Sequence, residues 1–251
     1  DNLKQATSVF TSFRENYEPR PFNILEENTI TFGLRTRLLG TYQLFDNIIK
    51  WTIGVEIFDE NYTNKTFDNL FQDFPKGTGS VQGKNLSDFK ENRNYYNVFA
   101  EVNYKFLENT TLSIGLNANE TWYKLDDRFE VSESNPDQSG DFSFNTIVSP
   151  KIGLSHLFLE NINGFVSVCH GFSPISLEET LLPDGQINID LQPETGWNFE
   201  VGARSNFFDN RLLFNLSLYR LDIENLLVSR RTAVNQFIGI NAGRTLHDGL
   251  E

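Results

Sequence analysis

Long apolar runs are missing from this sequence of 251 residues, of which only 39% are hydrophobic. No stretch approaches the roughly eighteen uninterrupted apolar residues that a membrane-spanning helix needs. A helical membrane protein is therefore excluded. A β-barrel is not excluded, because its strands are apolar on one face only and average out as polar.

Positive charge is also scarce, since 21 Lys and Arg stand against 34 Asp and Glu, a net charge of −13. Nucleic-acid binding needs an excess of Lys and Arg, so no nucleic-acid partner is expected. The single cysteine, Cys169, excludes an internal disulfide framework. The three histidines are scattered, at His156, His170 and His247, without metal-ligand spacing. No metal site and no cofactor are predicted.

A basic, apolar leader and Met are absent as well. We therefore expect a fragment, or a mature chain trimmed at both ends, and the absence of a leader says nothing about export.

Alternation with a period of two is the dominant pattern. Between Trp197 and Phe207, apolar and polar residues fall on opposite faces, because successive side chains of a strand point to opposite sides. The same pattern covers residues 30–38, 49–57, 98–106, 112–118 and 148–158, less cleanly 165–172 and 212–223, and in outline 3–13. These segments predict about nine strands, with another beginning near Ile240.

Short and long connections alternate between these segments. Turn residues rich in Asn, Asp and Gly make short joins near 45–47, 107–109, 160–164 and 208–210. Long polar connections are predicted near 62–93, 124–141, 173–195 and 229–237. Transmembrane barrels have this arrangement, with tight periplasmic turns and long outer loops. Segments of about ten residues also match the length of a tilted strand that crosses a bilayer.

The polar face carries charges, among them Glu56, Glu101 and Glu200. Burying an unpaired charge costs several kcal/mol, so we interpret this face as a wide lumen rather than a packed core. A soluble antiparallel sheet with one solvated face is the alternative. It predicts that Trp197, Val201, Val102 and Ile53 meet in one dry interior.

Five motifs in fixed order add a resemblance to this pattern. They read SPKIGL at 149–154, GFSPISLEE at 171–179, LQPETGWNFEVG at 191–202, YRLDIEN at 219–225 and NAGRTLHDGLE at 241–251. Together they resemble the later part of the barrel of TonB-dependent outer-membrane receptors. Residues 20–25, RPFNIL, suit a ferric-citrate or ferric-siderophore receptor in style. The strand before Gly171 departs from the family, since it lacks the usual aromatic and basic residues.

The resemblance implies an all-β, antiparallel transmembrane β-barrel segment, part of a 22-stranded barrel. Residues 1–251 would form one partial barrel domain without the family's plug and TonB-binding segment. It implies an outer-membrane receptor that is not an enzyme and that imports a scarce, bulky solute, a ferric siderophore above all. TonB would supply energy through the missing plug, and outer-membrane lipid would surround the barrel. A passive porin-like channel and a soluble all-β binding module are the alternatives.

Candidate ligand-binding residues follow from the predicted loops and lumen. We expect solute contact in the loops 62–93 and 173–195, at Tyr62, Phe71 and Phe74. Arg204 points into the predicted lumen, as do Arg35, Arg37, Lys105 and Lys151. Such cations could bind an anionic chelate, but we expect them mainly to balance lumen carboxylates.

The family motifs also imply structural residues. For Glu194 and Glu200, contact with the plug is favoured over lining a solute path. For Gly171, Phe172 and Pro174, turn geometry and an interfacial aromatic girdle are expected. The complete set is Pro150, Gly171, Phe172, Pro174, Glu178, Glu179, Pro193, Glu194, Glu200, Gly202, Asn241, Gly243, Gly249 and Glu251.

Other chemistry finds little support. The segment 184–190 has oxygen ligands at alternating positions, but it lacks the closing Glu of a calcium loop. Nucleophile elbows, phosphate-binding loops and zinc-protease motifs are absent from the sequence. Paired carboxylates are present, as in any acidic chain, so a glycosidase is disfavoured but not formally excluded.

Overall fold

A computed structural model describes residues 3–44, 47–133, 135–175, 188, 190–209, 211–233 and 236–251. Its elements are β1 (Leu3–Pro19), β2 (Asn23–Leu44), β3 (Asn47–Asn69), the 3-10 turn η1 (Phe71–Asp73), β4 (Gln82–Leu107), β5 (Thr110–Asp127), β6 (Gly140–Ser143), β7 (Ile147–Leu159), β8 (Ile162–Ser173), β9 (Glu194–Phe207), β10 (Leu212–Glu224), β11 (Leu227–Ala233), β12 (Gln236–Asn241) and β13 (Thr245–Leu250).

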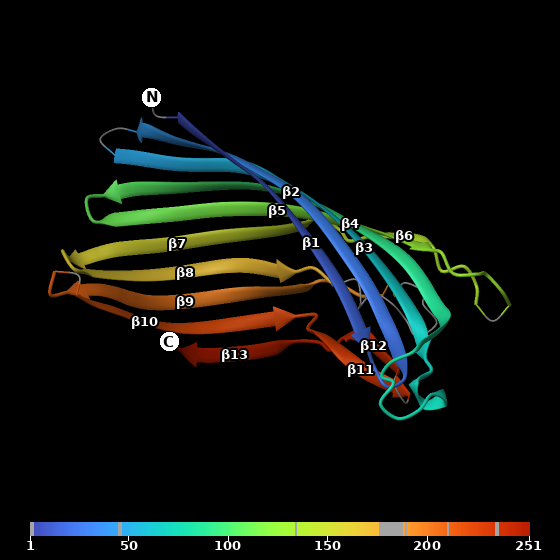
Figure 1. Ribbon diagram of the computed structural model, residues 1–251. Coiled ribbons are helices and arrows are strands. Elements are labelled where there is room, and N and C mark those ends of the chain that lie inside the picture. The colour runs from blue at the N-terminus through green and yellow to red at the C-terminus, as the bar shows by residue number, and fades with distance from the viewer. Residues whose placement is uncertain are drawn as a thin grey trace.

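One antiparallel sheet dominates the molecule (Figure 1). Its strands follow the order β1-β2-β3-β4-β5-β7-β8-β9-β10-β13, and β6 pairs with the outer end of β5. Apart from β6 and the hairpin of β11 and β12, which this path passes over, each strand pairs with the next one in the chain, so the path is a meander. The sheet curves into an open trough. The hairpin of β11 and β12 stands apart from this path. Nine strands of the path correspond to the nine predicted strands, and the tenth, β13, begins at Thr245 rather than near Ile240.

The convex face of the trough is apolar. Ile53 and Val102 are 47% and 39% exposed, and Trp197 and Val201 are 40% and 53% exposed. These four side chains come from β3, β4 and β9 and do not meet in a dry interior, which contradicts the soluble alternative on its own test. An apolar surface of this kind matches the lipid-facing band of a membrane barrel. On β10 the same face also carries Arg220 and Asp222, which form ion pairs with Asp248 and Arg244.

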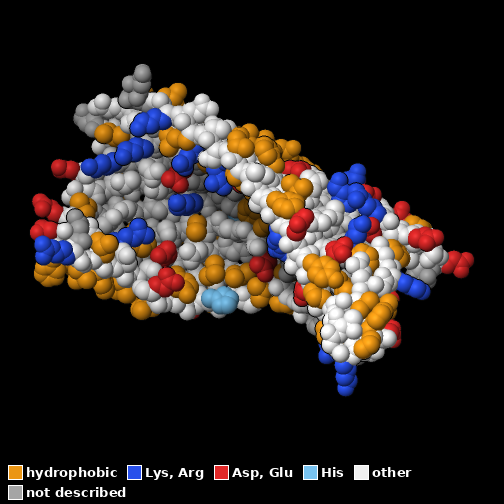
Figure 2. All heavy atoms as spheres, viewed as in Figure 1, with side chains coloured by type: hydrophobic (Ala, Val, Ile, Leu, Met, Phe, Trp, Pro, Cys, Tyr) orange, Lys and Arg blue, Asp and Glu red, His pale blue; other side chains and the backbone are white. Residues whose placement is uncertain are grey.

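Polar residues alternate with them and point into the trough. Glu56 on β3 pairs in register with Arg35 on β2, and Glu101 on β4 with Thr52 on β3. Figure 2 shows the hollow of the trough, where Lys and Arg side chains gather. The two faces of the sheet therefore have opposite chemistry, as the alternation predicts.

Several strands are longer than predicted. β2, β3 and β4 run for 22, 23 and 26 residues, about twice the length that crosses a bilayer. Most of the predicted loop 62–93 is consequently strand, and the connection itself spans residues 70–81. The prediction failed there because both faces of the outer extension are polar, so alternation disappears while backbone pairing continues.

Two other predicted loops also contain strands. β5 continues to Asp127, and β6 begins at Gly140, inside the predicted loop 124–141. Of the predicted loop 229–237, residues 229–233 belong to β11 and residues 236–237 to β12, and residues 234 and 235 lie outside the described residues. The last strand begins at Thr245, after β12 has already passed Ile240. In the segment 173–195, β8 ends at Ser173 and β9 begins at Glu194, and residues 176–187 and 189 lie outside the described residues.

Buried apolar side chains are few in the described chain and lie mainly at the outer end of the trough. Tyr123 and Leu125 of β5 are 4% and 1% exposed, and Ile175 is 1% exposed. Within the described residues, no helix has the length and apolar character needed to span a membrane. Cohesion along the wall therefore comes from the hydrogen-bonded ladders rather than from a central core.

Candidate functional site

A buried carboxylate on the concave face is held by two neighbouring strands. Glu56 is 6% exposed, its Oε2 accepts a hydrogen bond from Arg35 Nε, and its Oε1 accepts one from the hydroxyl of Tyr95 at 2.6 Å. Arg35 comes from β2 and Tyr95 from β4, on either side of Glu56 on β3. Arg35 therefore balances a lumen carboxylate, as expected.

The other cations of the lumen face differ in the side chains that they contact. Lys151 Nζ lies 3.5 Å from Glu101 Oε2, across Gly115 on the strand between them. Arg204 stacks over the ring of Phe165, with 4.6 Å from its Cζ to the ring centroid. Within the described part of the chain, Arg37, Lys50 and Lys105 form no ion pair. These three cations therefore have no carboxylate partner within ion-pair distance among the described residues.

Three aromatic rings form a row across the concave face, and we call Phe10, Phe58 and Tyr95 the aromatic row. The Phe58 and Tyr95 rings stack with centroids 4.8 Å apart at 14°, and Phe10 lies 6.4 Å from Phe58. Gly33 makes the row possible, because a Cβ there would lie 2.0 Å from Cζ of Phe10. The missing side chain on β2 lets Phe10 of β1 lean toward Phe58 of β3.

A guanidinium group completes this cluster. Arg93 Cζ lies 5.7 Å from the centroid of the Phe58 ring, and Arg93 Nη2 lies 2.7 Å from Glu60 Oε2. Its Nε is buried and has no hydrogen-bond partner among the described residues. Aromatic faces beside a guanidinium with a donor to spare suit a flat, anionic ligand.

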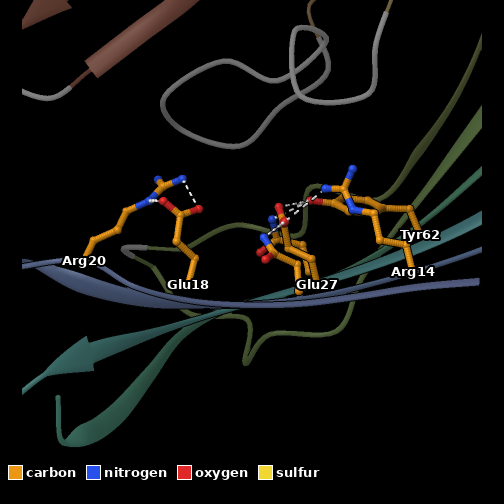
Figure 3. A network of polar contacts seen from close by, with 7 residues as sticks. Arg14, Glu18, Arg20, Glu27 and Tyr62 are labelled. Carbon is orange, nitrogen blue, oxygen red and sulfur yellow. Dashed lines mark hydrogen bonds and ion pairs between the residues drawn. The ribbon is translucent and has the colours of Figure 1, made fainter. Parts of the chain in front are cut away.

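A second polar network lies further out on the same face (Figure 3). Glu27 accepts hydrogen bonds from the hydroxyl of Tyr62 at 2.7 Å and from Asn16 Nδ2 at 2.9 Å. Arg14 Nη2 lies 3.7 Å from the same carboxylate, and Asn64 Nδ2 donates to Tyr62 at 2.9 Å. Strands β1, β2 and β3 thus converge on one buried acid.

The outer end of β5 is hydrogen-bonded to the chain that follows β8. The Tyr123 hydroxyl donates a 2.8 Å hydrogen bond to the carbonyl of Ile175. Phe144 packs edge-on against the Tyr123 ring at 5.7 Å. Burial raises the pKa of Tyr123 to about 12, against a smaller lowering influence of the Arg93 guanidinium. Tyr123 is therefore a neutral hydrogen-bond donor under ordinary conditions.

The sequence of this curved wall matches one family profile over its whole length. The profile is described as TonB dependent receptor-like, beta-barrel, and it matches residues 2–251. The chain belongs to the TonB-dependent receptor β-barrel family. The resemblance carried by the motifs of the second half is therefore confirmed, and it extends to the first half.

Solved receptor structures share the fold of this receptor barrel. The ferric citrate transporter FecA in its unliganded form superposes with a TM-score of 0.77 at 14% identity, covering 99% of this chain and 36% of that one. The siderophore receptor PiuA from Acinetobacter baumannii gives 0.76 at 15%, covering 100% and 41%. The alcaligin outer membrane receptor FauA from Bordetella pertussis gives 0.71 at 14%, covering 99% and 39%. The chain thus spans about two fifths of each solved structure.

The predicted ligand-binding residues do not converge in this receptor barrel. Tyr62 points into the trough at its outer half, where it belongs to the Glu27 network. Phe71 lies in η1 and Phe74 just after it, at the tip of the hairpin between β3 and β4. Arg204 lies near the opposite end of the wall, three residues before β9 ends at Phe207. Arg204 therefore lies apart from the other three side chains.

Residues of two motifs connect neighbouring segments of the sheet through hydrogen bonds. Asn241 Nδ2 donates to the carbonyls of Gln192 and Asn225 at 2.8 and 2.7 Å, and its Oδ1 accepts from the Gln192 amide at 2.9 Å. Glu194 Oε1 accepts a 2.7 Å hydrogen bond from the amide of Leu227. The LQPE and NAG motifs therefore join the start of β9 to the hairpin of β11 and β12. Within this structure Glu194 has a local partner.

The motif positions Gly202, Gly243 and Gly249 need glycine for different structural reasons. Gly243 has a φ of 96°, which favours glycine. A Cβ at Gly249 would lie 2.3 Å from Cζ of Tyr219, and one at Gly202 would lie 2.6 Å from Cζ of Phe165. Aromatic side chains thus cover both strand glycines.

The remaining motif residues lie along the strands. Pro150 lies in β7 opposite Leu116. Gly171 and Phe172 lie in the last residues of β8, and Pro174 follows that strand. Pro193 precedes β9, Glu200 faces the trough, and the Glu251 backbone pairs with Ser217. Glu178 and Glu179 lie outside the described residues, as does most of the candidate calcium segment 184–190. Within the described chain, no three His, Cys, Asp or Glu side chains form a group that could hold a metal ion.

Arg93, Phe58 and Phe10 were not among the predicted site residues. Phe10 and Phe58 stand on the polar faces of their strands, and large aromatics at such positions are the signal that could have found them. Arg93 lies at the end of the predicted loop 62–93, and hydrophobic alternation gives no direction for a loop side chain.

Proposed function

We propose that this chain is part of the wall of an active import receptor in the bacterial outer membrane, energised through TonB. The opposite chemistry of the two sheet faces carries the proposal. An apolar convex face suits hydrocarbon, and a charged concave face suits a lumen through which a polar solute moves. The plug that would transmit the action of TonB belongs to the remainder of such a receptor.

Ferric siderophores are the proposed solutes. The compared structures are described as receptors or transporters of ferric citrate, alcaligin and siderophores. In this chain, Arg93 beside the aromatic row offers a cation and ring faces to an anionic chelate. We propose this cluster as the solute contact of the wall, together with Tyr62 and the tip residues Phe71 and Phe74.

Uptake of iron-loaded chelates by cells that produce the full receptor tests the proposal. Cells would receive radioactive ferric citrate, a ferric catecholate or a ferric hydroxamate under iron limitation. We expect saturable accumulation of one of them that disappears in a strain without TonB. Equal uptake without TonB would support a passive channel and overturn active import.

Two substitutions test the solute site. Arg93→Ala and Phe58→Ala should each raise the half-saturating concentration of chelate by about tenfold, equivalent to about 1.4 kcal/mol. Arg244→Ala is the matched control, because this arginine pairs with Asp222 on the convex face of the sheet. Unchanged uptake by both lumen variants would remove the cluster from the solute path.

A further inference from the structure

Four cationic side chains gather on the concave face near the short turns. Lys4 lies on β1, Arg37 on β2, Lys50 on β3 and Lys105 on β4, and all four are exposed. Each lies an even number of residues from a side chain that faces the trough on its own strand, so each points the same way. Figure 2 shows Lys and Arg side chains in this part of the hollow. We call these four residues the inner cation cluster.

The strand register brings the members of the cluster close together. Lys50 and Lys105 lie diagonally across the ladder of β3 and β4, since Lys50 pairs with Asn103. Lys4 and Arg37 lie diagonally across the ladder of β1 and β2 in the same way. Side chains in this diagonal relationship are about 7–8 Å apart. Lys4 and Lys50 stand on either side of β2, about 12 Å apart along and across the strands, so one small chelate can contact both pairs.

The carboxylates nearest to the cluster already have other partners. Glu101 Oε1 accepts a hydrogen bond from Asn103 Nδ2 at 2.9 Å, and its Oε2 lies 3.5 Å from Lys151 Nζ. Glu56 is buried and pairs with Arg35. Among the residues that the structure describes, no member of the cluster forms an ion pair. The positive charge of the cluster is therefore available to a ligand.

The chemistry of the cluster favours a mobile anion with several charges. Like charges on neighbouring strands repel, so the cluster does not stabilise the wall by itself. A cavity lined by one sign of charge concentrates ions of the opposite sign. Three of the four residues are lysines, and the lysine ammonium is a compact, strongly hydrated charge on a flexible stem. Such groups attract a hydrated polyanion without fixing its orientation, and they let it leave again.

We propose that the inner cation cluster is a second anion site on the import route, and that it takes iron chelates that carry several carboxylates. Lys50 precedes Phe58 of the aromatic row by eight residues on β3, about 27 Å of extended strand. A chelate released from the aromatic row moves along the wall to the cluster and leaves at the short turns. The inference rests on the proposed function, because it requires a solute that crosses this lumen.

The side chains beside the cluster favour a hydrated solute over a packed protein contact. The core of a protein–protein contact is rich in aromatic side chains and depleted of charge. The cluster instead has short polar neighbours on the same face, among them Thr41 on β2, Thr52 on β3 and Asn103 on β4. The plug of the full receptor is therefore the less suitable partner for these four cations.

Protection of a thiol by citrate in the reconstituted full receptor tests this inference. In a Cys169→Ala background, Thr41→Cys places a thiol opposite Lys50. The neutral reagent methyl methanethiosulfonate labels this thiol, and citrate, which carries three carboxylates, is the probe that occupies the site. We expect citrate to slow the labelling several-fold more than sodium chloride does at the same ionic strength.

Two double variants show which lysines are responsible. Lys50→Gln/Lys105→Gln should raise the citrate concentration needed for half protection several-fold. Lys84→Gln/Lys124→Gln is the matched control, because it removes two exposed lysines from the outer parts of β4 and β5, and it should leave this concentration unchanged. Heat-modifiable electrophoretic mobility shows that each variant is folded. In cells, Lys50→Gln/Lys105→Gln should lower the maximal rate of uptake of the imported chelate several-fold, without changing its half-saturating concentration.

The outcomes separate this inference from the proposed function. Protection no greater than that given by sodium chloride, or equal protection in Lys50→Gln/Lys105→Gln, would overturn the anion site. A thiol that stays unlabelled without citrate would show a packed contact with the plug and would also overturn it. An unchanged maximal rate of uptake would remove the cluster from the import route. Uptake that does not depend on TonB in the unsubstituted receptor would strike the proposed function alone, because thiol protection needs no transport.

Discussion

Asn241 holds the backbone of Gln192 from both sides, donating to its carbonyl at 2.8 Å and accepting from its amide at 2.9 Å. The two residues are far apart in the chain but belong to two motifs of the receptor family. Their contact fixes where the hairpin of β11 and β12 leaves the wall. These two motifs therefore contact each other directly, through the side chain of Asn241 and the backbone of Gln192.

Loss of the Asn241 hydrogen bonds should loosen the hairpin of β11 and β12. Asn241→Ala removes three hydrogen bonds, each contributing about 1 kcal/mol. We expect faster proteolytic cleavage within β11 and β12 in the folded full receptor, with little change in the wall. Asn215→Ala, an exposed amide on β10, is the control. Equal cleavage of the two variants would contradict the role of Asn241.

The contact of Tyr219 with Gly249 predicts a steric effect at the last strand. A Cβ at position 249 would lie 2.3 Å from Tyr219 Cζ, so Gly249→Ala must displace the ring. We expect a loss of about 1–3 kcal/mol in the free energy of unfolding, measured as a lower midpoint of thermal unfolding. Adding Tyr219→Ala should partly restore the midpoint. Gly115→Ala should be tolerated, because its Cβ would have no neighbour closer than 3.6 Å.

The Glu56 cluster predicts a coupling between strands. Glu56→Gln leaves the Arg35 guanidinium without its carboxylate, although Tyr95 can still donate to the amide oxygen. Since the Arg35 side chain is 54% exposed, solvent screens much of the pair, and a coupling of about 1 kcal/mol is expected. A double-mutant cycle with Arg35→Ala, followed by thermal unfolding, measures it. Strictly additive effects would show that the pair contributes nothing.

Tyr123 predicts a dependence of stability on alkaline pH. Its pKa is raised from 10.0 to about 12 in the folded chain, so the folded state holds the proton more tightly than the unfolded state does. The resulting stability is complete below pH 10 and is lost as the pH rises toward 12. The midpoint of unfolding should fall between pH 9.5 and about 11.5 in the wild type, and less so in Tyr123→Phe. Parallel curves for both proteins would contradict this origin.

The membrane-level wall could be predicted from the sequence because lipid and lumen impose opposite demands on adjacent residues. Trp51, Ile53 and Val55 alternate with Thr52 and Gly54 for that reason. Above the membrane both faces meet water, so Asn92 and Asn94 look like loop residues although their backbone pairs regularly with β3. Hydrophobic alternation cannot detect a strand of this kind.

The candidate site depended on register, which alternation does not provide. Glu56 is visible as an inward carboxylate in the sequence, but its contacts with Arg35 and Tyr95 require the pairing of three strands. The aromatic row likewise needs Gly33 between Phe10 and Phe58. A single sequence gives the direction of such side chains but not their partners across the sheet.

Accessibility of spin labels in the reconstituted full receptor tests the central claim most directly. In a background with Cys169 replaced by Ala, labels at Val102 and Val201 would represent the convex face, and labels at Glu101 and Glu200 the concave face. The account predicts that convex labels relax faster with oxygen dissolved in the bilayer, and concave labels do not. Equal contact with oxygen, or the reverse order, would contradict a lipid-facing convex wall.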